Sequence, residues 1–154
     1  IVQAGVTFYE GDEQKSLIEN YTPSIAPRWD GRHLMTAWAI MRDQSLYWPW
    51  FNQTKAGILW NDSAIDVGLT HLRVAEMLKC GDRYKDAYRA MWTYPMREKL
   101  SQLSVPCLLC HPPWEPVAYT TKLAHTADPR SQMAELPLAM PDWHKVMDPF
   151  FGNT

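Results

Sequence analysis

Residues 104–117 read SVPCLLCHPPWEPV, and this segment decides the expected fold. Its apolar run is short and ends at Pro112–Pro113, a pattern typical of a buried strand rather than a helix. Residues 117–127 have the periodicity of a helix, and residues 132–136 form a second short strand before Pro137. The segment therefore predicts a strand–helix–strand unit with parallel strands and a right-handed crossover.

A last helix and a first strand complete the expected sheet unit. Asp142 can cap a last helix, which Gly152 ends. The apolar positions of that helix are Trp143, Val146, Met147 and Phe150. Residues 1–8 (IVQAGVTF) are apolar and predict a first strand that can pair with the two late strands. Parallel strands need neighbours and cover on both faces, so we expect the rest of the sheet on a missing segment or a partner chain.

Helical signals dominate between residues 12 and 95. Asp12 can cap a first helix, Asp30–Gly31 begins a second, Asp62 or Ser63 can cap a third, and Asp82 a fourth. The expected apolar faces are Leu34, Ala37, Trp38 and Met41 on the second helix, Ile65, Leu69, Leu72 and Ala75 on the third, and Tyr84, Ala87, Tyr88 and Met91 on the fourth. We expect three parts: residues 1–11 as a strand and entry, residues 12–95 as a helical block, and residues 96–154 as a βαβα tail.

Composition narrows the class of protein. Apolar residues make up 46% and charged residues 21% of the chain, which is typical of a globular rather than a disordered protein. A net charge of -2 and the lack of a basic run argue against nucleic acid and anionic membranes as partners. No apolar stretch is long enough to span a membrane, no signal peptide is visible, and three cysteines fit a reducing compartment, so we expect a cytoplasmic protein. The first residue is Ile1 rather than Met, which suggests a processed chain, a fragment, or part of something longer.

The order of elements and several sequence words resemble the later half of cap-bearing α/β-hydrolases. Residues 29–51 (WDGRHLMTAWAIMRDQSLYWPWF) and 78–92 (LKCGDRYKDAYRAMW) are similar to the helical lid of that family, and VPCLLCHPPWEPV is similar to its acid-bearing strand. The resemblance covers nearly the whole chain. It implies an α/β fold class: the C-terminal half of an α/β-hydrolase-like parallel sheet with an inserted helical cap.

The resemblance also implies catalytic residues. Glu115, followed by Pro116, stands where the family places its acid. The family's His follows the last strand, and the first His after Pro137 is His144, inside the predicted last helix. The nucleophile turn, G-x-S-x-G, and the oxyanion hole precede the lid in the family, and neither motif occurs here. The implied enzyme therefore takes its nucleophile from a missing N-terminal half or a partner chain, and acts on a small, partly apolar substrate through an ester, amide, epoxide or carbon–halogen bond.

The largest group of side chains suited to binding or catalysis lies in residues 29–51, the segment that is similar to the lid of that family. Its members are His33, Trp38, Arg42, Asp43, Tyr47, Trp48 and Trp50. Trp38 and Arg42 are one helical turn apart, which would let them line a substrate entrance with Arg42 anchoring a polar or anionic group. The competing interpretation is packing of the lid, with Arg42 and Asp43 as ordinary polar partners. Trp48–Pro49–Trp50 follows a helix end and is the part most expected to face a pocket.

Two alternatives remain open from the sequence. The same fold, without the usual His position, can serve as a non-catalytic binding or interaction subunit. In addition, Cys107-x-x-Cys110-His111 matches the pattern of covalent c-type haem attachment. Its position on an apolar strand favours buried cysteines that act as small hydrophobes, and zinc would lack an obvious fourth ligand. We therefore expect no cofactor and no metal.

Overall fold

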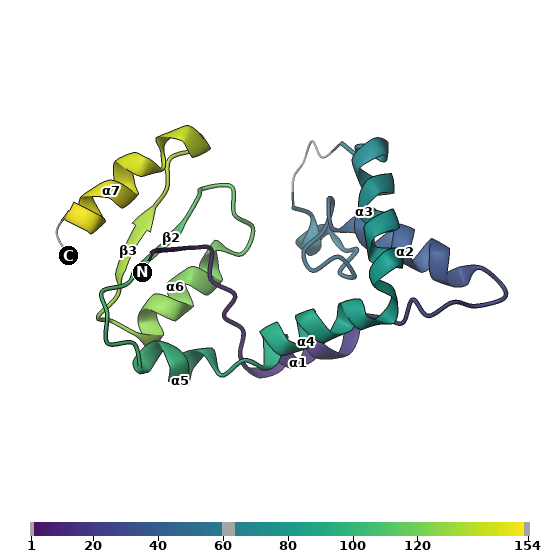
Figure 1. Cartoon of the computed structure of the whole chain (residues 1–154), viewed down its shortest axis with the longest axis horizontal. Coiled ribbons are helices and arrows are strands. Elements are labelled where there is room, and N and C mark those ends of the chain that lie inside the picture. The colour runs from purple at the N-terminus through teal and green to yellow at the C-terminus, as the bar shows by residue number, and fades with distance from the viewer. Residues whose placement is uncertain (1, 60–63, 153–154) are drawn as a thin grey trace. The chain divides into compact units, whose positions relative to one another are not determined.

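The computed structural model of the chain describes residues 2–59 and 64–152. The chain divides into two compact units (Figure 1). The helical unit is Glu10–Trp92, and the sheet unit combines the residues before Glu10 with those after Trp92. The sheet unit is thus built from two separate stretches of the chain, and the helical unit is inserted between them.

The sheet unit contains a three-stranded parallel sheet in the order β1-β2-β3. The strands are Val2–Ala4 (β1), Leu108–His111 (β2) and Gln132–Glu135 (β3). The register pairs Ala4 with Cys110 and Cys110 with Ala134. The expected pairing of the first strand with the two late strands is therefore confirmed, although β1 is shorter than residues 1–8.

Helices cover both faces of this sheet. Successive side chains of a strand point to opposite faces, and β2 accordingly contributes to two cores. One core packs against α5 (Met96–Ser101) and α6 (Ala118–Ala127), and the other against α7 (His144–Gly152); Figure 1 shows α6 and α7 on opposite sides of the strands. The first core consists of Val6, Phe8, Leu100, Cys107, Leu109 and Ala124, and the second of Leu108, Cys110, Leu136 and Phe150.

Two buried threonines of α6 hold the chain where it leaves β1. The backbone N–H of Val6 donates to Thr121 Oγ1 at 3.1 Å, and the Thr120 hydroxyl donates to the Val6 carbonyl. Both threonine side chains are fully buried, and hydrogen bonds satisfy their polar atoms as burial requires. The exit of β1 is therefore fixed next to the helix that follows β2.

The helical unit is built around two longer helices. α2 (Arg32–Asp43) packs against α3 (Val67–Cys80). α1 (Gly11–Asn20) contacts α4 (Tyr84–Thr93), because Gln14 Nε2 donates to Trp92 O at 2.6 Å. Its main core is Ile25, Ala37, Ile40, Val74, Met77 and Tyr84. Short 3-10 turns occupy Lys55–Gly57, Gly81–Arg83 and, in the sheet unit, Met140–Asp142. The Asp82 carboxylate accepts from the Ser24 hydroxyl and from the Ile25 N–H, both at 2.8 Å, and so ties the segment after α1 to the start of α4.

Several sequence expectations fail at helix ends and faces. α1 begins at Gly11 rather than after Asp12, α7 begins at His144 rather than after Asp142, and α5 was not expected at all. The expected caps Asp62 and Ser63 lie outside the described residues, and Asp66 caps α3 instead, accepting from Leu69 N at 2.9 Å.

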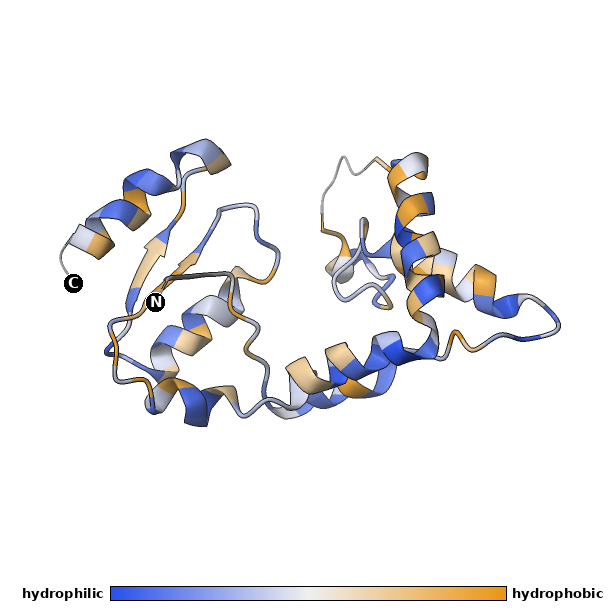
Figure 2. Ribbon diagram, viewed as in Figure 1, coloured by the Kyte–Doolittle hydropathy of each residue, from blue (hydrophilic) through white to orange (hydrophobic). Residues whose placement is uncertain are grey.

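The apolar face expected for α3 is also wrong. Ile65, Leu69 and Leu72 are exposed, whereas Thr70, Val74 and Met77 are buried. Figure 2 shows hydrophobic residues along α3 as well as on the strands, so this helix carries apolar residues on more than one side. None of the described helices is both long and apolar enough to cross a membrane.

Candidate functional site

Glu115 lies in the loop that follows β2, at the carboxyl edge of the parallel sheet, where open α/β sheets bind their ligands. Its backbone forms turns through Glu115 N to Pro112 O and Ala118 N to Glu115 O, both 3.1 Å, and its half-buried side chain accepts from Val117 N at 3.4 Å. Gly5, which follows β1 with a φ of +74°, donates its N–H to Cys110 O at 2.8 Å. A Cβ at Gly5 would lie 3.8 Å from Glu115 Oε2. The carboxylate therefore sits against the ends of both β1 and β2.

His144 is the first residue of α7, and its side chain is exposed. Its Nδ1 lies 2.8 Å from the Pro141 carbonyl. Because a carbonyl can only accept, this hydrogen bond requires the proton on Nδ1 and leaves Nε2 as the basic nitrogen. No hydrogen bond joins His144 to Glu115 within residues 64–152, so a backbone carbonyl orients the ring in this structure.

The loop after β2 and the segment after β3 leave the same edge and touch one another. Trp114 Nε1 donates to Leu138 O at 3.4 Å, and Leu136 N donates to His111 O at 2.9 Å. Within the second segment, Trp143 Nε1 donates to Pro137 O at 3.0 Å. The structure thus brings the two segments that carry Glu115 and His144 to one edge, and Trp114, which sequence reasoning passed over, is the side chain that links them.

Arg42 is engaged inside the helical unit. Its guanidinium contacts Asp43 through two hydrogen bonds, Nε to Oδ1 at 2.6 Å and Nη2 to Oδ2 at 3.0 Å, and Gln53 Nε2 donates to Asp43 Oδ2 at 2.8 Å. Asp43 is only 1% exposed, and its hydrogen bond raises the pKa of Arg42. Arg42 therefore compensates a buried carboxylate, and the predicted role as a substrate anchor finds no support in this geometry.

Replacement of Arg42 by methionine should lower the free energy of unfolding by about 1–3 kcal/mol, because Asp43 loses its charged partner while still buried. The loss should stay below that of a fully buried pair, since the Arg42 side chain is 39% exposed and water can reach it. Urea unfolding would measure the change, and Arg83→Met is the control. The Arg83–Asp86 pair is exposed, and its loss should cost less than about 1 kcal/mol. Equal losses in the two variants would contradict the role given to Arg42.

The three predicted tryptophans are half-buried and contact other residues of the helical unit. Trp38 lies half-buried against the main core. Trp50 Nε1 donates to Tyr21 O at 2.9 Å, and the Trp48 ring centroid is 5.7 Å from that of Tyr21. Tyr21 is the centre of an aromatic cluster that also includes Phe51, Tyr88 and Trp92, and burial raises its pKa.

Two residues next to these tryptophans line a pocket. Pro49 and Phe51 line an open pocket of about 370 Å³, together with Glu13, Ser16, Leu17 and Asn52. Pro49 therefore lines a pocket, as expected for residues 48–50, whereas the exposure of Trp48 and Trp50 to a pocket stays a prediction. Glu13, Phe51 and Asn52 were not predicted, because nothing in the sequence relates α1 to this later loop.

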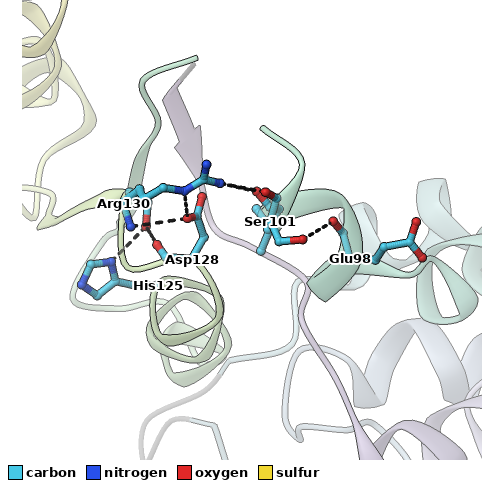
Figure 3. A network of polar contacts seen from close by, with 7 residues as sticks. Glu98, Ser101, His125, Asp128 and Arg130 are labelled. Carbon is cyan, nitrogen blue, oxygen red and sulfur yellow. Dashed lines mark hydrogen bonds and ion pairs between the residues drawn. The ribbon is translucent and has the colours of Figure 1, made fainter. Parts of the chain in front are cut away.

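A polar network lies at the opposite, amino edge of the sheet (Figure 3). Arg130 Nε contacts Asp128 Oδ1 at 2.7 Å, and Arg130 Nη2 donates to Ser101 O at 3.0 Å. The Arg130 guanidinium lowers the pKa of Asp128, which is 4% exposed. These contacts tie the end of α5 to the turn that precedes β3.

The same network contains a Ser, a His and an Asp, yet its hydrogen bonds are not those of a catalytic triad. Ser131 Oγ donates to the Asp128 backbone carbonyl at 2.6 Å, and His125 Nδ1 lies 2.9 Å from Ser131 Oγ. The Asp128 carboxylate contacts Arg130, whereas a triad carboxylate orients the histidine. Because the Ser131 hydroxyl donates its hydrogen bond to a backbone carbonyl, it has a structural role in this turn.

The cysteines argue against the haem alternative. Cys107 and Cys110 are buried in the cores on opposite faces of the sheet, so one porphyrin cannot reach both thiols. Burial raises the pKa of both thiols, which favours the neutral form. His111 is 4% exposed, and its Nδ1 lies 3.3 Å from Pro112 O. Within the part of the chain that the structure describes, no group of three or more His, Cys, Asp or Glu is arranged to hold a metal ion.

Comparisons of this chain with protein-family models, with curated proteins and with solved structures found no match.

Proposed function

We propose that this chain forms the helical cap and the acid-bearing C-terminal part of an α/β-hydrolase-type enzyme. The proposal depends on the position of Glu115, which follows the carboxyl end of β2 and lies beside the end of β1. These two strands are neighbours in a parallel sheet, and the helical unit is inserted between them in the sequence. The sequence words of the lid and of the acid-bearing strand support the same family.

In this proposal Glu115 orients a histidine, and that histidine accepts the proton of a nucleophile supplied by another segment or chain. His144 is the candidate base, because its exposed ring has the proton on Nδ1 and Nε2 open to accept. With a serine as that nucleophile, the reaction would cleave an ester or amide bond of a small, partly apolar molecule. A fold does not determine which reaction an enzyme catalyses. The bond that is cleaved therefore depends on the nucleophile, which lies outside residues 1–154 in this proposal.

The sheet itself supports a missing segment. Among the described residues, β1 and β3 each pair only with β2, so both outer edges of the sheet are open. Open edges expose unpaired N–H and C=O groups, which proteins normally pair or cover. We propose that the N-terminal half of the hydrolase core, on a longer chain or on a partner, completes the sheet beside β1.

A fluorophosphonate probe, which labels activated serines, tests this assignment. The protein is isolated from its native source, its intact mass is measured, and the probe is added to the whole assembly. We expect label on a serine outside residues 1–154, either in a longer form of this chain or in a co-purifying chain. A native mass equal to that of this chain, with no labelled partner, would contradict the proposal.

One observation favours a second candidate, a non-catalytic binding subunit of the same fold. His144 is oriented by the Pro141 carbonyl and not by Glu115, so the acid and the base are not coupled in this structure. An assembly that contains the missing half, yet shows neither labelling nor turnover, would support this candidate.

A further inference from the structure

A histidine side chain closes the turn that leads into α2. The backbone N–H of Arg28 donates to Nδ1 of His33 at 3.1 Å. An N–H group can donate only to a ring nitrogen that carries no proton, so this hydrogen bond requires the neutral ring with its proton on Nε2. The ring proton of His33 is therefore placed opposite to that of His144, whose Nδ1 is a donor.

A carboxylate holds the same turn through separate contacts. Asp30 Oδ1 accepts from Arg32 N at 3.1 Å and from Arg28 Nε at 3.3 Å, and Asp30 Oδ2 lies 3.3 Å from Arg28 Nη2 and from Arg32 Nε. Gly31, with a φ of +73°, donates its N–H to Arg28 O at 3.1 Å. Between these fixed residues lies Trp29, which is 98% exposed. The turn thus holds a fully exposed tryptophan on an ordered backbone.

The His33 and Asp30 contacts respond to acid in different pH ranges. Histidine ordinarily changes its charge between about pH 5 and 8, and the charged ring carries a proton on both nitrogens and accepts no hydrogen bond. The side chain of Arg28 and the backbone N–H of Arg32 hold the pKa of Asp30 below its ordinary value, so this carboxylate stays ionised when His33 becomes charged. Mild acid therefore removes the hydrogen bond to His33 and leaves those to Asp30.

The charges around His33 come from the same short segment. The Asp30 carboxylate interacts electrostatically with the charged ring and favours it, whereas Arg28 and Arg32 oppose it and are themselves paired with Asp30. Among the described residues, no side-chain hydrogen bond or ion pair joins His33 to α3 or α4. We propose that His33 is a pH-sensitive switch: protonation of its ring releases the Arg28 N–H and increases the mobility of the turn that carries Trp29.

¹H–¹⁵N NMR of the full chain, recorded from pH 8 to pH 5, tests the proposal. At pH 8 we expect the ring nitrogens of His33 to report a proton on Nε2 and none on Nδ1. As the ring gains its second proton, the Arg28 amide resonance should shift with the same midpoint. The protection factor of the Arg28 N–H against exchange should fall roughly threefold to tenfold, the loss of one hydrogen bond. The indole N–H of Trp29 should become more mobile over the same range.

Replacement of His33 separates the effect of the ring from that of the rest of the turn. The side-chain oxygen of glutamine can accept a hydrogen bond but does not titrate. In His33→Gln, the Arg28 resonance should therefore be independent of pH across this range. His71→Gln is the matched control, because His71 is exposed on α3, and this variant should keep the wild-type shift of Arg28.

The other outcomes overturn the proposal. A proton on Nδ1 of His33 at pH 8, or an Arg28 amide that is unchanged from pH 8 to pH 5, would show that the ring does not accept from Arg28. An Arg28 shift with the same midpoint in His33→Gln would assign the titration to another group. Constant mobility of Trp29 would show that the turn is not released. Because these measurements require no nucleophile, their failure is distinct from a failure of the hydrolase proposal.

Discussion

In the proposed hydrolase, replacement of Glu115 by glutamine should reduce turnover of the assembled protein roughly 10²-fold to 10⁴-fold, the loss expected when a histidine loses the carboxylate that orients it. Glutamine keeps the size of the side chain and can still accept from Val117 N, a contact of 3.4 Å in the native protein. The change therefore removes the charge with little disturbance of the loop. Hydrolysis of p-nitrophenyl butyrate would report kcat and KM, and thermal unfolding would report stability.

Glu135→Gln is the control for this experiment. Glu135 is also a carboxylate at the carboxyl end of a strand, but it ends β3 and its side chain is exposed. We expect unchanged turnover in this variant and unchanged thermal midpoints in both. Wild-type turnover in Glu115→Gln would remove Glu115 from the mechanism, and an equal loss in both variants would indicate a general effect of charge at that edge.

Replacement of Leu109 by alanine should lower the free energy of unfolding of the sheet unit by about 3–4 kcal/mol. Leu109 is 1% exposed on the central strand, and it shares a core with Val6, Phe8 and Ala124. Its side chain contacts residues from both separate stretches of the sheet unit, so the cavity would weaken the joint between them. A domain has about 5–15 kcal/mol of stability in total, so this loss is a large fraction.

Denaturant unfolding followed by near-UV circular dichroism would measure this loss, with Val105→Ala as the control. Val105 precedes the same strand but is 48% exposed, so its truncation should change stability by less than about 0.5 kcal/mol. A similar effect of both substitutions would show that the core does not close on Leu109.

The strands could be predicted from the sequence because β1 lies in the apolar residues 1–8, β2 is an apolar run that ends at a proline, and β3 is short and lies just before a proline. The buried strand β2 ends directly before Pro112, and β3 ends shortly before Pro137. The end of β2 in turn determines the position of Glu115. The six-residue α5 was missed because only Leu100 is fully buried on it, which gives no detectable periodicity.

The helical unit illustrates what periodicity cannot decide. α3 carries two apolar stripes, one through Leu69 and Leu72 and one through Val74 and Met77. Both fit a helix, and only the packing of α2 against α3 selects the second. Similarly, the size of tryptophan predicts burial or a binding surface equally well, and only the structure shows that the half-buried Trp48 and Trp50 pack against Tyr21.

The inserted helical unit has a consequence for synthesis of the protein. β1 cannot meet β2 until all the residues between Ala4 and Leu108 have left the ribosome. At roughly 5–20 residues per second, that interval lasts on the order of 5–20 s. During this time all residues of the contiguous helical unit are synthesised, so this unit can fold. Val6 and Phe8, in contrast, remain without the later residues that complete their core. The first stretch of the sheet unit is therefore the part of the nascent chain most dependent on protection from aggregation.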